Sequence, residues 1–279
     1  MPNKQNNSPE FEQKANLLVT TEGLRMRSVA NGKVLRDLTL GESVEDLGPD
    51  TSAGWRKIKV QDISGVAFNK YLRTPLHSNI EALLRAALDE WLFFGKGTSN
   101  EKSEMHYKRV GEMWNALGEQ YDGRSKYSDG KDVPWSAAFI SWVVRNAGTP
   151  YANFKFSSSH SVFVNNAIKA QVTGRRDKPF WGYPITEAKV ELGDIVQRNR
   201  GDGAYSFSYA ENHSQYESHS DIVVEVTSGV ARVLGGNVSD SVTLQGSKQE
   251  YELDERGHIK PNQNVIAILK NRTGLRVEN

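Results

Sequence analysis

The stretch that decides the fold is Val133-Pro134-Trp135-Ser136-Ala137-Ala138-Phe139-Ile140-Ser141-Trp142. Proline and tryptophan come directly before a serine, and a run of mostly apolar residues follows it to Ala147 and ends at Gly148, a common helix terminator. The pattern predicts a helix over 136–147 that carries the Ser136 hydroxyl in its first turn. Free N–H groups and a partial positive charge at a helix N-terminus favour an attacking alkoxide and a nearby oxyanion.

Three segments further along the chain also carry chemically useful side chains. Glu191–Val196 reads as a turn that leads into a strand, and Ser218–Val224 places His219 at the start of a hydrophobic strand. Val233–Ser239 places the amide of Asn237 just beyond the next strand. The chemistry of the second half is therefore expected from a serine, a histidine and a polar residue contributed by separate elements.

Together these segments resemble the CHAP and NlpC-type branches of the papain-like amidase and endopeptidase superfamily, over roughly residues 76–270. The resemblance implies a papain-like α+β domain over 76–279. It places Ser136 at the nucleophile position, His219 at the position of the base, and Asn237 at the position of the residue that orients the base. It also implies hydrolysis of amide bonds in or next to the stem peptide of peptidoglycan.

The sequence departs from that superfamily at the nucleophile, because Ser136 stands where a cysteine is expected. An inactivating Cys→Ser change, a natural serine-dependent branch, and an inert binding site are three explanations. A little-characterised branch of the superfamily is similar over Trp135–Ser141 and has serine there, which favours a natural serine. A serine nucleophile needs a positioned base, which Ser-His-polar triads supply on several folds.

Other residues near these motifs have more than one interpretation each. Trp135 is expected either to stack on a bound sugar or peptide, or to anchor the helix start. His160 either lines the cleft, acts as a second base, or is a polar helix-start residue. Asp221 lies two residues after His219 and therefore on the same side of a strand, where it would hold His219, bind substrate, or be a simple charge at the strand edge. His213, His219 and Asp221 also have ligand types that suit zinc, but their spacing matches no metal motif, so no metal or other cofactor is predicted.

The remaining periodicity places helices before strands in the second half, which predicts an α+β fold. Apolar stripes at helical spacing run from Ser78 to Leu92 and from about Ser103 to Leu117. Segments that read as strands follow at 194–197, 221–226, 230–234 and 265–269.

Residues 16–74 follow a different pattern, of short apolar runs broken by turns, which predicts a small β-barrel. The ordered pieces Gly23–Ser28, Gly41–Val44, Gly54–Ile58 and Ser64–Ala67 resemble a bacterial SH3-like domain. Such domains commonly accompany cell-wall enzymes and bind wall peptides; a barrel that only spaces or stabilises the enzyme is the alternative. Residues 1–15 are polar and are expected to form a disordered arm.

The amino-acid composition limits the kinds of partner and chemistry that the protein can have. The 279 residues carry 35 Lys+Arg against 34 Asp+Glu, which favours neither a nucleic-acid partner nor an anionic membrane surface. No cysteine is present, which excludes disulfides and thiolate chemistry. No apolar run is long enough for a membrane span, and the N-terminus lacks the pattern of a signal peptide.

The sequence therefore predicts a peptidoglycan hydrolase with an SH3-like module, of the kind found as delivered antibacterial toxins or phage-type lysins. It would be cytoplasmic in the producer and reach the periplasm or cell wall of a target by a non-classical route, with an immunity protein or secretion machinery as partners. A wall-binding pseudoenzyme and a metal-dependent hydrolase are the alternatives.

Overall fold

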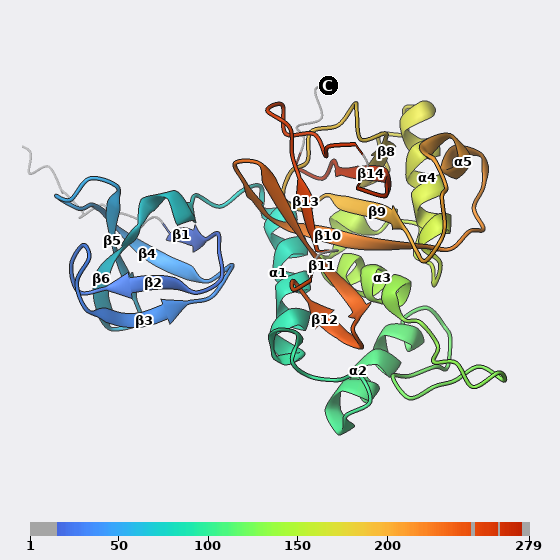
Figure 1. The fold of residues 1–279 in the computed structure, drawn as a ribbon, viewed down its shortest axis with the longest axis horizontal. Helices are drawn as coiled ribbons and strands as arrows, with labels where there is room; N and C mark the ends of the chain where they lie inside the picture. The colour runs from blue at the N-terminus through green and yellow to red at the C-terminus, as the bar shows by residue number, and fades with distance from the viewer. Residues whose placement is uncertain (1–15, 247–248, 262, 275–279) are drawn as a thin grey trace, which may run out of the picture. The chain divides into compact units, whose positions relative to one another are not determined.

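The chain divides into two compact units, Met1–Pro75 and Leu76–Asn279, each with its own antiparallel sheet. The computed structural model describes residues 16–246, 249–261 and 263–274 (Figure 1). The arm expected over residues 1–15 lies outside the described residues. Antiparallel sheets accompanied by helices make the fold α+β, as the order of the predicted elements indicates.

The first unit is a single sheet with strand order β3-β2-β6-β5-β4-β1-β7. Its side chains alternate as the sequence suggests: Leu24 and Met26 are buried, while Arg25 between them is exposed. The SH3-like nature of this unit stays a prediction. Its elements are β1 (Asn16–Val19), β2 (Leu24–Arg27), β3 (Val34–Leu38), β4 (Ser43–Pro49), β5 (Trp55–Val60), β6 (Ile63–Phe68), the 3-10 turn η1 (Asn69–Tyr71) and β7 (Leu72–Arg73).

The second unit begins with helices. Helix α3 packs on strands β10 and β11, and α4 packs on β8 (Figure 1). The helical elements are α1 (Ser78–Phe93), η2 (Gly95–Gly97), α2 (Glu104–Asn115), α3 (Ser136–Asn146), η3 (Thr149–Tyr151), α4 (His160–Val172) and α5 (Phe207–Asn212).

The sheet of the second unit runs in the order β12-β11-β10-β9-β14-β8, with β13 paired to β11. The last strand along the chain, β14, therefore lies between β9 and β8. The strands are β8 (Phe180–Tyr183), β9 (Ile195–Asn199), β10 (Ser218–Thr227), β11 (Val230–Val238), β12 (Ser241–Thr243), β13 (Glu250–Glu252) and β14 (Val265–Asn271).

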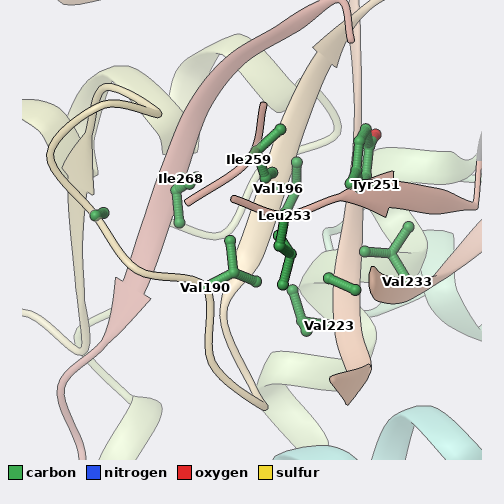
Figure 2. Close-up of a cluster of buried hydrophobic side chains, with 10 residues drawn as sticks. Val190, Val196, Val223, Val233, Tyr251, Leu253, Ile259 and Ile268 are labelled. Atoms are coloured by element: carbon green, nitrogen blue, oxygen red, sulfur yellow. The ribbon is translucent and has the colours of Figure 1, made fainter. Parts of the chain in front are cut away.

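One face of this sheet is closed by a buried apolar cluster. Figure 2 shows Val196, Val223 and Val233, which come from β9, β10 and β11, together with Tyr251 of β13 and Leu253 just after it. Because the side chains of a strand alternate between its two faces, every second residue of β9 counted from Val196, and of β10 counted back from Val223, is on the face of this cluster. Asp221, two residues before Val223 in β10, is therefore on the same face as Val223.

The turn before β9 explains the Gly-Asp pair of the sequence. Gly193 has φ +83°, a conformation that favours glycine. The buried Asp194 carboxylate accepts hydrogen bonds from the backbone N–H groups of Glu191 (2.8 Å) and Asn271 (2.9 Å), and it pairs with Lys270. Burial raises the pKa of Asp194 to about 6, although Lys270 and these hydrogen bonds oppose the rise. Asp194 therefore fastens β14 to the start of β9.

Candidate functional site

The start of helix α3 is held in place by Trp135. The Trp135 side chain is 0% exposed, stacks on Phe94 with ring centroids 5.6 Å apart, and meets Phe139 edge-on at 6.3 Å. Its indole N–H donates a hydrogen bond to the buried carboxylate of Glu101. Trp135 therefore anchors the start of the helix. Its side chain does not reach solvent, where it could stack on a substrate, which was the other expectation for this residue. Burial raises the pKa of Glu101, against the effect of that hydrogen bond.

Two consecutive glycines of β11 allow the site to form. A Cβ on Gly236 would lie 2.4 Å from Phe139 Cγ, so the strand can pass close to α3 only without a side chain there. A Cβ on Gly235 would lie 1.8 Å from Asp221 Oδ1 and 3.1 Å from His219 Nε2. One glycine therefore makes room for the helix and the other for the polar pair of β10.

The hydroxyl of Ser136 contacts a histidine from the neighbouring helix. Ser136 Oγ lies 2.8 Å from His160 Nε2, and the two residues are only 3% and 6% exposed. His160 is the first residue of α4, so two helix starts converge at this contact. A hydroxyl within hydrogen-bond reach of an imidazole is the arrangement of an activated serine nucleophile and its base.

Two further hydrogen bonds fix the position of the α4 start. Ser161 Oγ donates to the carbonyl of Ser214 at 2.9 Å, and Asn165 Nδ2 of the same helix donates to the carbonyl of Ala210 at 2.9 Å. These bonds tie the first turns of α4 to α5 and to the segment that follows it. The His160 ring is thereby brought beside the start of β10.

His219 lies at that start and contacts both His160 and Asp221. The His160 and His219 ring centroids are 5.3 Å apart with the planes tilted by 44°. His219 Nε2 lies 2.8 Å from Asp221 Oδ1. The expected nucleophile, His219, Asp221 and His160 thus occur at one place, but the nearest partner of the Ser136 hydroxyl is His160 and not His219.

Asp221 is the most enclosed member of the group, with 0% exposure. Gln249 Nε2 donates to Asp221 Oδ1 at 3.2 Å, and Arg198 Nε of β9 lies 3.4 Å from Asp221 Oδ2. Burial alone would raise the pKa of Asp221, but His219, Arg198 and Gln249 outweigh it and hold the pKa below its ordinary value. Asp221 is therefore a buried carboxylate that is ionised at neutral pH.

The electrostatics at His160 are opposite to those at Asp221. Burial holds the pKa of His160 well below its ordinary value, and Coulombic interactions with His219, Arg200 and Arg198 lower it further. The ring is therefore neutral at neutral pH, the state that can accept a proton. Its Nδ1 is buried and has no hydrogen-bond partner among the described residues.

The backbone beside Ser136 can bind an oxyanion. The first backbone hydrogen bond of the helix runs from the Phe139 N–H to the Trp135 carbonyl at 2.9 Å. The side chain of Trp135, the N-cap residue, makes no capping hydrogen bond. The N–H groups of Ser136 and Ala137 consequently have no acceptor within the helix. Such groups, next to a nucleophile, can stabilise the negative oxygen of a tetrahedral intermediate.

The remaining candidates lie in different places. Asn237 has φ +56° and lies at a register shift between β11 and β12. Asn237 was expected to orient His219, but the side chain that contacts His219 Nε2 is that of Asp221. Arg198 and Gln249 were not predicted as site residues. Arg198 lies in the polar end of β9, between Gln197 and Asn199, and gave no signal in the sequence. Gln249 lies in a loop and gave no signal either.

The proposed zinc ligands are not grouped. His213 is exposed, stacks on Tyr209 with ring centroids 3.9 Å apart, and its Nδ1 lies 2.9 Å from the Tyr209 carbonyl. Across the parts of the chain that the structure describes, no cluster of three or more His, Asp or Glu side chains could hold a metal ion. In the same described ranges, no helix is both long and apolar enough to cross a membrane.

An α+β unit with a serine–histidine contact at a helix start defines a candidate hydrolase-type site. The chain belongs to the family described as "Uncharacterized protein conserved in bacteria (DUF2272)", whose model matches residues 93–270. That range contains Ser136, His160, His219 and Asp221.

Several solved structures are similar to this chain, and two of them are NlpC proteins. NlpC2 from Trichomonas vaginalis is 12% identical with a TM-score of 0.29, over 91% of this chain and 71% of that one. NlpC1 from the same organism is 12% identical with a TM-score of 0.26, over 82% of this chain and 63% of that one, so the match spans less than two thirds of NlpC1. No curated protein sequence matches.

Proposed function

We propose that this protein is a serine-dependent hydrolase that cleaves an amide bond in or next to the stem peptide of peptidoglycan. The observation that carries the proposal is the 2.8 Å contact between Ser136 Oγ and His160 Nε2 at the uncapped start of α3. A buried, neutral imidazole at this distance is suited to take the serine proton during attack.

The chemical step follows from that contact. Ser136 Oγ attacks the carbonyl carbon while His160 Nε2 accepts its proton, and the N–H groups of Ser136 and Ala137 hold the carbonyl oxygen as it becomes negative. His160 thereby takes the role that the sequence motifs gave to His219. Loss of a nucleophile in such a unit lowers turnover by as much as ~10⁶-fold.

The substrate class is supported by the likeness of the Pro-Trp-Ser-Ala-Ala-Phe helix start to the NlpC and CHAP branches, where a wall amide is hydrolysed. An SH3-like first unit that binds wall peptides is part of the same proposal. So are a role as a delivered antibacterial toxin or phage-type lysin and an immunity protein as partner.

The test is release of new amino termini from purified sacculi. The parent, Ser136→Ala, His160→Gln and Ser136→Cys are compared, with Ser141→Ala as the matched control. Ser141 is a buried serine of the same helix whose hydroxyl donates to the Ser157 carbonyl at 2.8 Å, away from His160. We expect release by the parent, by Ser141→Ala and by Ser136→Cys, and none by Ser136→Ala or His160→Gln.

Two further measurements separate the alternatives. A fluorophosphonate, which reacts with activated serines irrespective of the natural substrate, should label the parent and Ser141→Ala but not Ser136→Ala. A chelator should leave release unchanged, whereas loss of release would support a metal-dependent hydrolase. Sacculi that are bound by the parent but never cleaved, with no labelling of Ser136, would refute catalysis and indicate a wall-binding pseudoenzyme.

A further inference from the structure

The carboxylate of this site is attached to a different histidine from the one that contacts the serine. In a Ser-His-Asp triad one imidazole bonds the serine through one nitrogen and the carboxylate through the other. Here His160 Nε2 contacts Ser136, but His160 Nδ1 has no hydrogen-bond partner in the described parts of the chain. The carboxylate of Asp221 instead contacts His219.

We propose that His160 and His219 divide the proton transfers, with His160 serving the Ser136 oxygen and His219 serving the leaving amine and then the incoming water. This inference rests on the proposed function. The ring centroids are 5.3 Å apart, so the two rings are close enough to serve two atoms bonded to the same carbonyl carbon. Because His219 Nε2 is engaged by Asp221, its Nδ1 is the nitrogen that exchanges a proton with the substrate.

The acylation step balances with the two rings in opposite states. Ser136 Oγ forms a bond to the carbonyl carbon and its proton moves to neutral His160. The carbon–nitrogen bond then breaks, its electron pair goes to nitrogen, and protonated His219 supplies a proton so that a neutral amine leaves. At the end of acylation His160 is protonated, His219 is neutral, and Ser136 is an ester.

Deacylation returns both rings to their starting states. Water attacks the ester carbonyl carbon and gives one proton to His219 Nδ1. The bond to Ser136 Oγ breaks, and the oxygen takes back the proton held by His160. The net reaction is hydrolysis of one amide by one water, and no other reactant is required.

The charges around the rings favour this division. Burial, and the Coulombic effects of His219, Arg200 and Arg198, act on His160 and favour its neutral form. His219 is paired with the ionised carboxylate of Asp221, which carries the countercharge for a protonated ring, while Arg198 of β9 also faces that carboxylate. Two titratable groups in contrasting environments are the usual sign of separate acid and base roles.

The experiment is rapid-mixing kinetics with a p-nitrophenyl ester, whose leaving group departs as an anion and needs no proton. We expect His219→Gln to release about one p-nitrophenolate per protein in a fast burst and then to turn over ~10²–10⁴-fold more slowly than the parent, because deacylation lacks its base. His160→Gln should lose the burst itself by a similar factor. Asp221→Asn should give the pattern of His219→Gln, with a smaller loss of turnover.

The control is His213→Gln, an exposed histidine outside the site, which should match the parent in burst and turnover. A folded His219→Gln protein without a burst, or with the turnover of the parent, would overturn the division of roles, as would a normal burst in His160→Gln. If His219→Gln does not fold, Asp221→Asn decides by the same criterion. Failure of the proposed function gives a different result, namely no p-nitrophenolate release by the parent above the uncatalysed rate, or unchanged release by Ser136→Ala.

Discussion

Replacement of Gly235 by alanine would test how tightly β11 packs on the polar pair of β10. The added Cβ would begin 1.8 Å from Asp221 Oδ1, and ordinary contact requires 3.4 Å or more. Because Asp221 is fully buried, its carboxylate has to rotate away, and its 2.8 Å hydrogen bond to His219 Nε2 is lost. Overpacking of a core costs about 1–3 kcal/mol, and disturbance of a buried ion pair adds to it. We expect the free energy of unfolding to fall by about 2–4 kcal/mol.

The assay is urea unfolding of four proteins: the parent, Gly235→Ala, Asp221→Ser, and the double variant. Asp221→Ser removes the oxygen that the new methyl group strikes, so the two changes should be non-additive, and the double variant should be about as stable as Asp221→Ser alone. An unchanged urea midpoint for Gly235→Ala, or simple additivity in the double variant, would show that the contact drawn here does not limit the packing.

Three other predictions use the same unfolding measurement. Glu101→Ala leaves the buried indole N–H of Trp135 without an acceptor and should cost about 1–3 kcal/mol, whereas Glu101→Gln retains an acceptor and should cost less than half as much; equal losses would contradict this role. Gly111→Ala, inside α2 with its nearest new contact at 3.4 Å, should stabilise the protein by about 0.5–1 kcal/mol, and a loss would mean that the helix has no room there. Because the folded pKa of His160 lies below its unfolded value, the unfolded chain binds the extra proton first, so stability should fall as the pH drops below about 6.5 towards the folded pKa. His160→Gln should flatten that part of the profile, and an unchanged slope would contradict a buried neutral ring.

Local patterns in the sequence predicted the helix that carries Ser136, but not the partner of the Ser136 hydroxyl. The stretch from Ser136 to Ala147 contains both ends of α3, because helix starts and stops are encoded by neighbouring residues. The contact with His160 depends on how α4 docks beside α3, which is a tertiary property. A histidine at a helix start, taken alone, is equally typical of a surface position.

The strands show the same limit. The apolar pattern predicted 221–226, but β10 begins earlier, at Ser218, because its polar first residues are buried and paired with β9. Asn237 could not be placed from the sequence, since a register shift beside it breaks the alternation on which such a prediction depends. Short elements such as β12 and β13 are defined by their partners in the sheet rather than by their own residues.

The position of β14 has a consequence for synthesis of the chain on the ribosome. Ser136 and His160 emerge within 24 residues of each other, yet β9 acquires its second neighbour only when Val265–Asn271 has been made. Until then β9 is an open edge and β8 has no partner in the sheet. Asp194, which fastens β14 to β9, likewise waits for Lys270 and the backbone of Asn271. A nascent chain therefore carries an incomplete sheet until β14 has been made, and β10, which holds His219 and Asp221, pairs until then with a β9 that lacks its other neighbour.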